Sequence, residues 1–166
     1  MVHGDDDGIV LPPRIAPTQV VILPVHRSED AKSLVDEYAD QVAGGLRSRH
    51  FAGGKVRIAI DRREARGGQK QWEWIKKGVP LRIEIGVRDI ESGCVTLSRR
   101  DRDSSGKMSI PLADLPETVT SMLDEIQRGC FERALQFRSD HTRMISERGE
   151  FEKFFKPVAE QHTLSR

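Results

Sequence analysis

The sequence predicts an α/β fold in which a mixed β-sheet is flanked by helices. Apolar runs typical of strands alternate with helical periodicity through the first half of the chain, which favours parallel strands joined by crossover helices. Two later strand segments follow each other directly and indicate an antiparallel hairpin. The chain has 166 residues, of which 37% are hydrophobic and 32% charged, and this profile suits one soluble domain with a buried core.

The first half of the chain supplies an arm, two strands and a helix. Three prolines exclude a helix from residues 1–17, which we expect to form an extended arm. Residues 18–25, TQVVILPV, are typical of a buried strand. Ser28 is a suitable N-cap for a helix over 29–51, and a Gly-Gly pair separates this helix from an alternating strand over 55–61. The helix has apolar residues at helical spacing, namely Leu34, Val35, Tyr38, Val42 and Leu46.

The middle of the chain adds a helix and a strand. A basic, glycine-containing loop over 62–69 precedes a short helix over 70–78. Residues 79–89 alternate apolar and polar side chains, which predicts a half-exposed strand. Ligands of such sheets commonly meet the loops at the carboxyl ends of the strands. We therefore expect the basic loops that follow 55–61 and 79–89 to share one rim of the sheet.

The remaining elements are a hairpin and a long helix. Residues 94–101 and 107–112 predict two strands joined by the turn RDSSG. Pro116 opens a helix that extends to about residue 145, and a weaker helical segment follows over 150–158. The apolar side of the long helix contains Val119, Met122, Ile126, Cys130, Leu135 and Phe137.

Charge is distributed unevenly along the chain. The formal net charge is only +1, from 27 basic and 26 acidic side chains. Residues 55–110 nevertheless carry 14 basic and 8 acidic side chains, against 5 and 8 in 1–54 and 8 and 10 in 111–166. A local positive field guides a polyanion to a surface. The alternative is an ordinary solvated face of mixed sign.

Neither the cysteines nor the apolar segments indicate an exported or membrane protein. Cys94 and Cys130 are too few and too far apart for a disulfide framework or a metal clip, so we expect two free, buried thiols. The chain begins without a secretory signal, and no apolar run approaches the roughly 20 residues that cross a bilayer. We expect a cytoplasmic protein with no membrane partner.

The sequence contains none of the common catalytic or phosphate-binding motifs. A GxxxxGK[ST] loop, a GxGxxG turn, an HExxH pair and a nucleophile elbow are all absent. The five histidines are scattered, and the acidic residues at 5–7 are more typical of a solvated loop than of a cation site. We therefore expect no catalytic residue, no metal site and no cofactor in this chain.

Since no catalytic motif is present, recognition of a partner is the remaining class of function, and segment 62–89 has the composition for it. Basic side chains supply phosphate contacts and aromatic faces stack unpaired bases. An arginine beside a carboxylate such as Asp89 can contact opposite edges of a guanine. The alternative is that Trp72 and Trp74 anchor a short helix in the core and that the charges solvate it. The basic residues of the segment are Arg62, Arg63, Arg66, Lys70, Lys76, Lys77, Arg82 and Arg88.

Two segments carry a family resemblance. VHGDDDGIVLPPRIAPTQVVILPV (2–25) and KKGVPLRIEIGVRDIESGCVTLSRRD (76–101) strongly resemble prolyl-tRNA synthetase in its eukaryote/archaeon-like form. The likeness begins at the end of the catalytic domain and runs through the anticodon-binding domain. ERALQFRSDHTRMISERGEFEKFF (132–155) extends it toward the C-terminal domain, and GVPLRIEIGxRD is its most specific motif.

The resemblance implies a fold and a division into domains. The anticodon-binding domain of class II synthetases of this kind has a mixed five-stranded sheet and about three helices. By this resemblance, residues 1–17 are the tail of the catalytic domain and 18–121 the anticodon-binding domain. Residues 122–166 are then a long helix and the start of a truncated C-terminal region.

The resemblance also implies a site. The family grips the anticodon of proline tRNA, in which two adjacent guanines are the identity bases. By matched positions, Arg82, Arg88 and Asp89 look like the base-reading residues, and Lys77 and Lys70 are candidates for contact with the RNA backbone.

One position departs from the family and makes base reading there doubtful. The family usually has WELKG where this chain has WIKKG, so Ile75 replaces a glutamate that helps to recognise an anticodon guanine in relatives. An aliphatic side chain cannot accept the N–H groups of guanine, and loss of one polar pair costs roughly 1–3 kcal/mol of discrimination. We expect weaker anticodon specificity than in relatives.

The resemblance finally bears on activity. The family places its three catalytic motifs before the equivalent of His3, so we expect this chain alone to form no prolyl-adenylate. The parent enzyme uses ATP and magnesium to join proline to its tRNA, and a separate catalytic-domain chain is a candidate partner. Three hypotheses follow: a fragment of prolyl-tRNA synthetase that binds the anticodon, a stand-alone module redirected to another RNA or a protein, and a decayed gene product.

Overall fold

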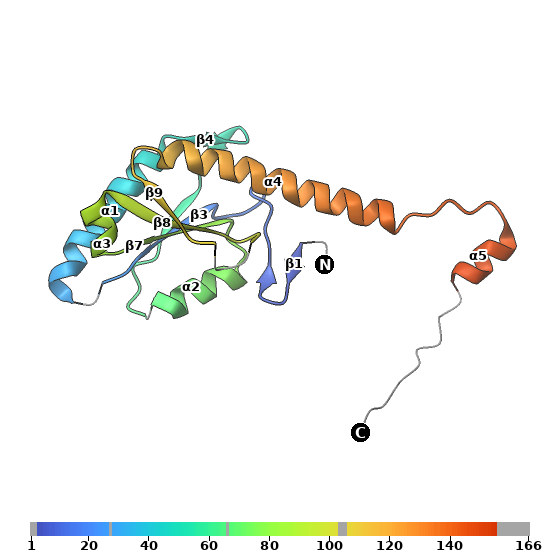
Figure 1. Ribbon diagram of the computed structural model, residues 1–166, viewed down its shortest axis with the longest axis horizontal. Helices are drawn as coiled ribbons and strands as arrows, with labels where there is room; N and C mark the ends of the chain where they lie inside the picture. Colours follow the sequence, from blue (N-terminus) through green and yellow to red (C-terminus); the bar gives the residue numbers. More distant parts are fainter. Residues whose placement is uncertain (1–2, 27, 66, 103–105, 156–166) are drawn as a thin grey trace, which may run out of the picture. The chain divides into compact units, whose positions relative to one another are not determined.

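A mixed five-stranded sheet forms the centre of the computed structural model, which describes residues 3–26, 28–65, 67–102 and 106–155. Its strands β6, β3 and β7 are parallel, and β8 and β9 continue the sheet in antiparallel fashion. The strand order and bounds are β6 (Ile58–Ile60), β3 (Val20–Pro24), β7 (Leu81–Ile85), β8 (Cys94–Arg99) and β9 (Met108–Pro111). The predicted fold class, a mixed five-stranded sheet with flanking helices, is confirmed (Figure 1).

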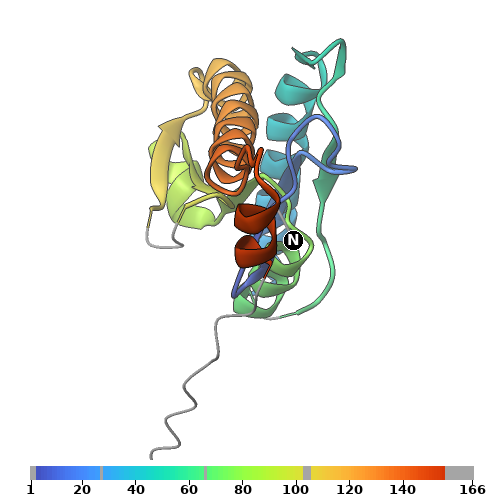
Figure 2. The same ribbon diagram turned by 90° about the vertical axis from the view of Figure 1, so that its right-hand side faces the viewer.

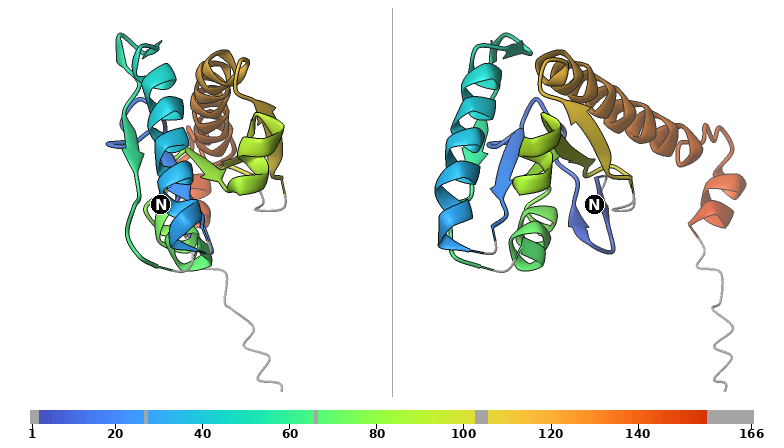
Figure 3. Two further views of the ribbon diagram at one scale, coloured as in Figure 1. Left: turned by 90° about the vertical axis from the view of Figure 1, so that its left-hand side faces the viewer. Right: turned by 60° about the vertical axis from the view of Figure 1, so that its left-hand side comes forward.

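Helices cover both faces of this sheet. The long helices α1 (Glu29–Arg47) and α4 (Leu115–Asp140) lie on one face, and α2 (Gly67–Lys76) lies on the other (Figure 1). The short helix α3 (Val87–Ser92) lies near α1, on the same side of the sheet (Figure 3). The result is a three-layer arrangement in which helices cover both faces of the central strands, while the edge strand β9 exposes Ser109 and Pro111.

The main core fills the layer between the sheet and the helices α1 and α4. Alternate residues of each strand point into it, as the pleat requires. From β7 these are Leu81, Ile83 and Ile85, which pack with Val95 and Leu97 of β8. The helices contribute buried side chains at helical spacing: Val35, Ala39, Val42, Ala43 and Leu46 from α1, and Leu115, Val119, Leu123, Ile126 and Cys130 from α4.

The opposite face of the sheet, here called the α2 face, has two chemically different halves. Over β3 it is apolar, because Val21 and Leu23 pack with Val79 and Trp74. Over β7 and β8 the alternation places polar side chains on it, namely Arg82, Glu84, Thr96 and Ser98.

Residues 79–89 were predicted as one half-exposed strand, and this prediction is wrong in two respects. The strand ends at Ile85, and Gly86 begins helix α3, because the Asp89 carboxylate accepts the Gly86 N–H at 2.8 Å and caps the new helix. The polar side of β7 is also buried, since α2 is hydrogen-bonded across it: Gln71 donates to Glu84 at 2.9 Å.

The N-terminal arm is docked on the sheet rather than merely extended. A short ladder joins β1 (Gly4–Asp5) to β2 (Gly8–Ile9). The Arg100 guanidinium holds it through paired hydrogen bonds to the Asp5 carboxylate and one to the Gly8 carbonyl. Further along, Arg57 donates to the Ala16 carbonyl at 2.8 Å.

The first predicted helix ends earlier than expected, and α2 begins earlier. α1 stops at Arg47, and the next residues form a tight hairpin of β4 (His50–Phe51) and β5 (Gly54–Lys55) next to the end of α1 (Figure 2). Ala52 and Gly53 at its tip both have positive φ, which is the conformation of a two-residue type I′ turn. α2 starts at Gly67, three residues before the predicted start at residue 70.

The C-terminal part of the chain is a separate compact unit, with the division between Ala134 and Leu135. α4 ends at Asp140 rather than near residue 145, and α5 (Arg148–Phe154) lies within the predicted helical segment 150–158 apart from its start. Residues 156–158 of that segment, and 103–105 of the predicted hairpin turn, lie outside the described residues. Leu135 and Phe137 are exposed rather than buried, because the core contacts of α4 end at Cys130. Leu34 of α1 is likewise exposed.

Both cysteines are free thiols, but only Cys130 is buried, and Cys94 is half-buried. Burial raises the pKa of the Cys130 thiol. Within the described part of the chain, no helix combines the length and apolar character needed to cross a membrane.

Candidate nucleic-acid interface

The carboxyl edge of the three parallel strands gathers many of the polar residues that the sequence singled out. Because β6, β3 and β7 run in the same direction, the residues that follow them share one edge of the sheet. Asp61, Arg62 and Arg63 follow β6, and the Gly86–Asp89 turn follows β7. The segments that follow β6 and β7 thus share one rim as predicted, but the second is the start of helix α3 rather than a basic loop, with Arg88 as its one basic residue.

Arg88 and Asp89 lie together at this edge, beside a cavity of about 420 Å³. Arg88 is exposed, whereas Asp89 is half-buried. The Asp89 carboxylate accepts the Gly86 N–H at 2.8 Å and the Thr96 hydroxyl at 2.9 Å. These two hydrogen bonds fix its orientation and leave further lone pairs for an additional donor. The other lining residues come from the ends of β3 and α1 and from α3, namely Val25, His26, Ser28, Ala31, Gly86 and Val87.

Arg82 is placed differently, because its guanidinium is buried in the polar half of the α2 face. The residue is 1% exposed, and its Nε and Nη1 atoms have no hydrogen-bond partner among the described residues. The hydroxyl of Ser98, its partner across the strand pair, is buried and equally unpaired there. Burial lowers the pKa of Arg82, and the neighbouring Arg100 lowers it further while Glu84 raises it.

The doubtful position, Ile75, adjoins Arg100, the arginine that, in addition to burial, lowers the pKa of Arg82. Its residue is 8% exposed, and its carbonyl accepts a hydrogen bond from Nε of Arg100 at 3.0 Å. The position that carries glutamate in the resembled family is therefore buried next to the guanidinium of Arg100.

The two lysines predicted to contact the RNA backbone have opposite environments. Lys70 is 4% exposed, and its ammonium donates to the carbonyls of Pro24 and Asp61 at 3.0 and 3.3 Å. It therefore ties α2 to the ends of β3 and β6. Lys77 is exposed, and its ammonium lies 4.3 Å from the centre of the Trp74 ring.

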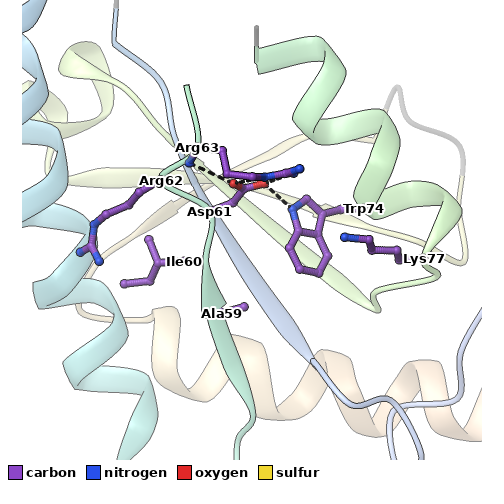
Figure 4. A pocket seen from close by; sticks show the side chains of 7 residues that line it. All are labelled: Ala59, Ile60, Asp61, Arg62, Arg63, Trp74 and Lys77. Carbon is purple, nitrogen blue, oxygen red and sulfur yellow. Dashed lines mark hydrogen bonds and ion pairs between the residues drawn. The ribbon is translucent and has the colours of Figure 1, made fainter. Parts of the chain in front are cut away.

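Trp74 and Asp61 form a hydrogen-bonded unit that sequence reasoning missed. The indole Nε1 donates to Asp61 Oδ2 at 2.8 Å, and Arg63 binds the same carboxylate through Nε at 2.9 Å and Nη2 at 2.7 Å (Figure 4). These bonds, chiefly that from Arg63, hold the pKa of Asp61 well below its ordinary value, although burial opposes them. The only sequence signal for this unit is the close spacing of Asp61 and Arg63, which could have suggested their ion pair.

The two tryptophans therefore differ. Trp74 packs against the apolar half of the α2 face, as the core-anchor alternative predicts. Trp72 is 44% exposed, with the Lys76 ammonium 5.4 Å from its ring centre.

No group of three or more potential metal ligands occurs among the residues that the structure describes.

Comparison with known proteins identifies relatives of this chain. The family described as "Anticodon binding domain" matches residues 19–122. The chain is 45% identical over 155 residues to a proline–tRNA ligase of Akkermansia muciniphila, covering 93% of this chain and 31% of the relative. It is 46% identical over 157 residues to proline–tRNA ligase 2 of Anaeromyxobacter dehalogenans, covering 95% and 31%. The chain thus spans about a third of the length of the curated relatives that it matches.

Proposed function

Because this chain belongs to the anticodon-binding domain family and is homologous to a region of the proline–tRNA ligases, we propose that it binds the anticodon of proline tRNA. The observation that carries the proposal is that the exposed Arg88 and the oriented Asp89 carboxylate line one cavity at the carboxyl edge of the sheet.

This pair matches the chemistry of guanine. Arginine presents a fork of donors that suits the O6 and N7 acceptors of the base, and a carboxylate accepts from its N1–H and N2–H donors. The hydrogen bonds from Gly86 and Thr96 hold the Asp89 oxygens in place before RNA arrives. Recognition then requires little ordering of the protein at this position.

Arg82 is the natural second reader, because its donors lack partners. A buried, unpaired guanidinium is costly, and an acceptor supplied by a ligand removes that cost. In the proposal, the RNA reaches Arg82 by displacing the side chains that cover the polar half of the α2 face. Lys77 contacts the backbone directly, whereas Lys70 supports the site by holding α2 to the strand ends.

The proposal extends to the parent protein. We place the chain in a prolyl-tRNA synthetase of the eukaryote/archaeon-like form, which joins proline to its tRNA with ATP and magnesium in the cytoplasm. Under this proposal, residues 1–17 are a catalytic-domain tail, 18–121 the anticodon-binding domain and 122–166 the helix that leads onward. The adenylate-forming residues then belong to another part of the protein or to a separate chain.

Ile75 favours a second candidate function, a stand-alone module that binds another RNA or a protein. An apolar side chain at this position removes an acceptor for guanine, so the base preference inherited from the family is weakened. A module that no longer discriminates the anticodon guanines fits the second candidate and contradicts the first.

The test compares two substitutions that remove the same charge. Arg88→Gln alters the proposed site, whereas Arg47→Gln alters the last turn of α1, about 28 Å along a 19-residue helix that begins beside that site. We expect Arg88→Gln to reduce the preference for proline tRNA over a tRNA with altered anticodon guanines by about tenfold or more, and Arg47→Gln to leave it unchanged.

Binding is measured across a salt series, because a steep salt dependence alone reports only phosphate contacts. If the unaltered protein binds both tRNAs equally, the anticodon function is overturned. Equal loss of affinity in both variants, without a change of preference, would also contradict the role of Arg88.

A further inference from the structure

A second cavity, of about 700 Å³, lies beside the edge strand β6 (Figure 4). Ala59 and Asp61 border it from the sheet, and Trp74 and Lys77 border it from α2. On one side of α2, Gln71 is hydrogen-bonded to Glu84 of β7, and the Ile75 carbonyl to Arg100, which follows β8. On the other side, Trp74 is hydrogen-bonded to Asp61, which follows β6. The cavity is therefore on the opposite flank of α2 from Arg82.

The Trp74 ring is a rigid platform in this cavity. Its Nε1–H is held by Asp61 at 2.8 Å, and the ring packs against the cluster of Val21, Leu23 and Val79. Asp61 is itself fixed by the two hydrogen bonds from Arg63. An aromatic ring immobilised in this way stacks on a ligand without a large loss of side-chain entropy.

Lys77 is the cation that remains available at this platform. Arg62 is paired with Asp36 and Asp40, and Arg63 with Asp61 and Glu73. Lys77 forms no ion pair within 4 Å among the described residues, although the pKa of the nearby Glu73 is lowered by Arg63 and, to a smaller extent, by the charge of Lys77. The Lys77 ammonium rests over the Trp74 ring at 4.3 Å. A base that stacks on the ring would displace the ammonium, which is then free to bind an anion beside that base.

We propose that this cavity binds one nucleotide of single-stranded RNA, with its base stacked on Trp74 and its phosphate held by Lys77. The proposal rests on the RNA-binding function proposed above and adds a subsite to it. A single unpaired cation suits one phosphate of a chain better than the several charges of a free nucleoside triphosphate. Every base has a π face, and the other charged side chains that line the cavity, Asp61, Arg62 and Arg63, are engaged in ion pairs within the protein. The subsite is therefore expected to tolerate any sequence.

The position of the cavity allows one RNA strand to occupy both sites. Asp61 follows β6 and Gly86 follows β7, and only β3 lies between them in the sheet. Two strand spacings separate the two positions by about 10 Å. An RNA strand whose guanine contacts Arg88 and Asp89 therefore reaches Trp74 within a few nucleotides.

The neighbouring Lys76 provides a matched control. Its ammonium also lies over an indole ring, at 5.4 Å from Trp72, but neither residue borders the cavity. Lys77→Gln and Lys76→Gln thus remove the same charge from adjacent positions above two different rings. Both lysines are exposed, so neither substitution disturbs the core.

The experiment measures the fluorescence of Trp74 in the full chain carrying Trp72→Phe, with oligoadenylate and with the anticodon stem-loop of proline tRNA. We expect both RNAs to quench Trp74. Lys77→Gln is expected to weaken oligoadenylate binding about fivefold, and Lys76→Gln to change it less than twofold. Adenosine monophosphate at the same concentration is expected to quench weakly.

The outcomes separate this subsite from the proposed function. If the protein prefers the anticodon guanines but Trp74 fluorescence does not respond, the subsite is overturned and the anticodon function stands. If Trp74 is quenched in a manner that depends on Lys77 but no guanine preference exists, the anticodon function fails and the subsite stands. Equal effects of the two lysine substitutions would overturn the subsite, because they would indicate only general charge attraction.

Discussion

Replacing Arg82 with methionine should stabilise the protein while weakening its binding to RNA. Arg82 is 1% exposed, and two of its nitrogens are buried without a partner among the described residues. Each unmade hydrogen bond of a buried group costs about 1–3 kcal/mol, and replacing buried ions by apolar side chains of similar volume often stabilises proteins by about 1–4 kcal/mol. Methionine replaces the aliphatic stem of the arginine side chain, carries no buried donor, and adapts to irregular space.

The expected gain in the free energy of unfolding is therefore roughly 1–3 kcal/mol, since the new side chain also loses some packing. For a chain of this size, each kcal/mol raises the melting temperature by about 2–4 °C. Urea unfolding at pH 7, followed by circular dichroism and extrapolated to water, measures the gain directly. Affinity for proline tRNA, measured on the same preparation, should fall because the guanine loses a donor pair.

Arg99 provides the control for this reasoning. It is also buried, but it is fully paired, with two hydrogen bonds to Asp101 at 2.9 and 3.0 Å and one to Glu125 at 2.6 Å. Arg99→Met should destabilise the protein by about 3–5 kcal/mol, because it leaves the buried Asp101 carboxylate without its partner. The argument fails if Arg82→Met lowers the free energy of unfolding by more than about 1 kcal/mol, as a paired arginine would.

Three further predictions concern the contact between Gly78 and the N-terminal arm, the loss of stability at acidic pH, and the doubtful site position, Ile75. Gly78→Ala should destabilise the protein by at least about 1 kcal/mol more than Gly93→Ala, since both residues have positive φ but only at Gly78 would a Cβ lie 2.7 Å from Ile9; equal losses in thermal unfolding would contradict this. The free energy of unfolding should decline as the pH falls below about 4, because Asp61 has a lowered pKa in the folded state and its stabilising contribution is lost as the carboxylate becomes protonated. Asp61→Asn should make the free energy of unfolding depend less on pH in this range. An unchanged slope would refute the assignment to Asp61. Ile75→Glu should raise the preference for the anticodon guanines about tenfold in competition binding, and an unchanged preference would show that this position does not contact the base.

The alternation of side chains along the strands predicted much of the fold. Apolar residues at every second position of β7 placed Leu81, Ile83 and Ile85 on one face, and these residues do lie in the core. Where the pattern was ambiguous, the prediction failed. Val87 continues the alternation past the end of β7, so periodicity alone could not show that Asp89 caps a new helix at Gly86.

The surroundings of the site residues could be predicted less well from the sequence. Periodicity states which face a residue occupies but not what covers that face. Arg82 was therefore placed on the polar side of its strand correctly, while its burial depends on α2, a helix whose contacts with β7 are long-range. Lys70 shows the same limit, because only the assembled sheet brings the carbonyls of Pro24 and Asp61 to its ammonium.

The charge balance around Arg82 connects the departure at Ile75 with the proposed function. Arg82 and Arg100 lie close enough for one to lower the pKa of the other. Asp5 is already engaged by two hydrogen bonds from Arg100, and Glu84 is shared between Gln71 and Lys107. Glu84 therefore compensates Arg82 only in part, and no carboxylate among the described residues is hydrogen-bonded to its Nε or Nη1.

An isoleucine at position 75 preserves this excess of positive charge, whereas a glutamate would reduce it. The interior of the protein contains a guanidinium whose hydrogen bonds are incompletely satisfied, and the energetic cost of this group is explained where a ligand removes it. A polyanion with acceptor groups on its bases meets that requirement both by charge and by hydrogen bonding. Under the proposed function, Ile75 leaves recognition to the donors of Arg82, and we expect affinity for RNA to be retained while discrimination between bases is reduced.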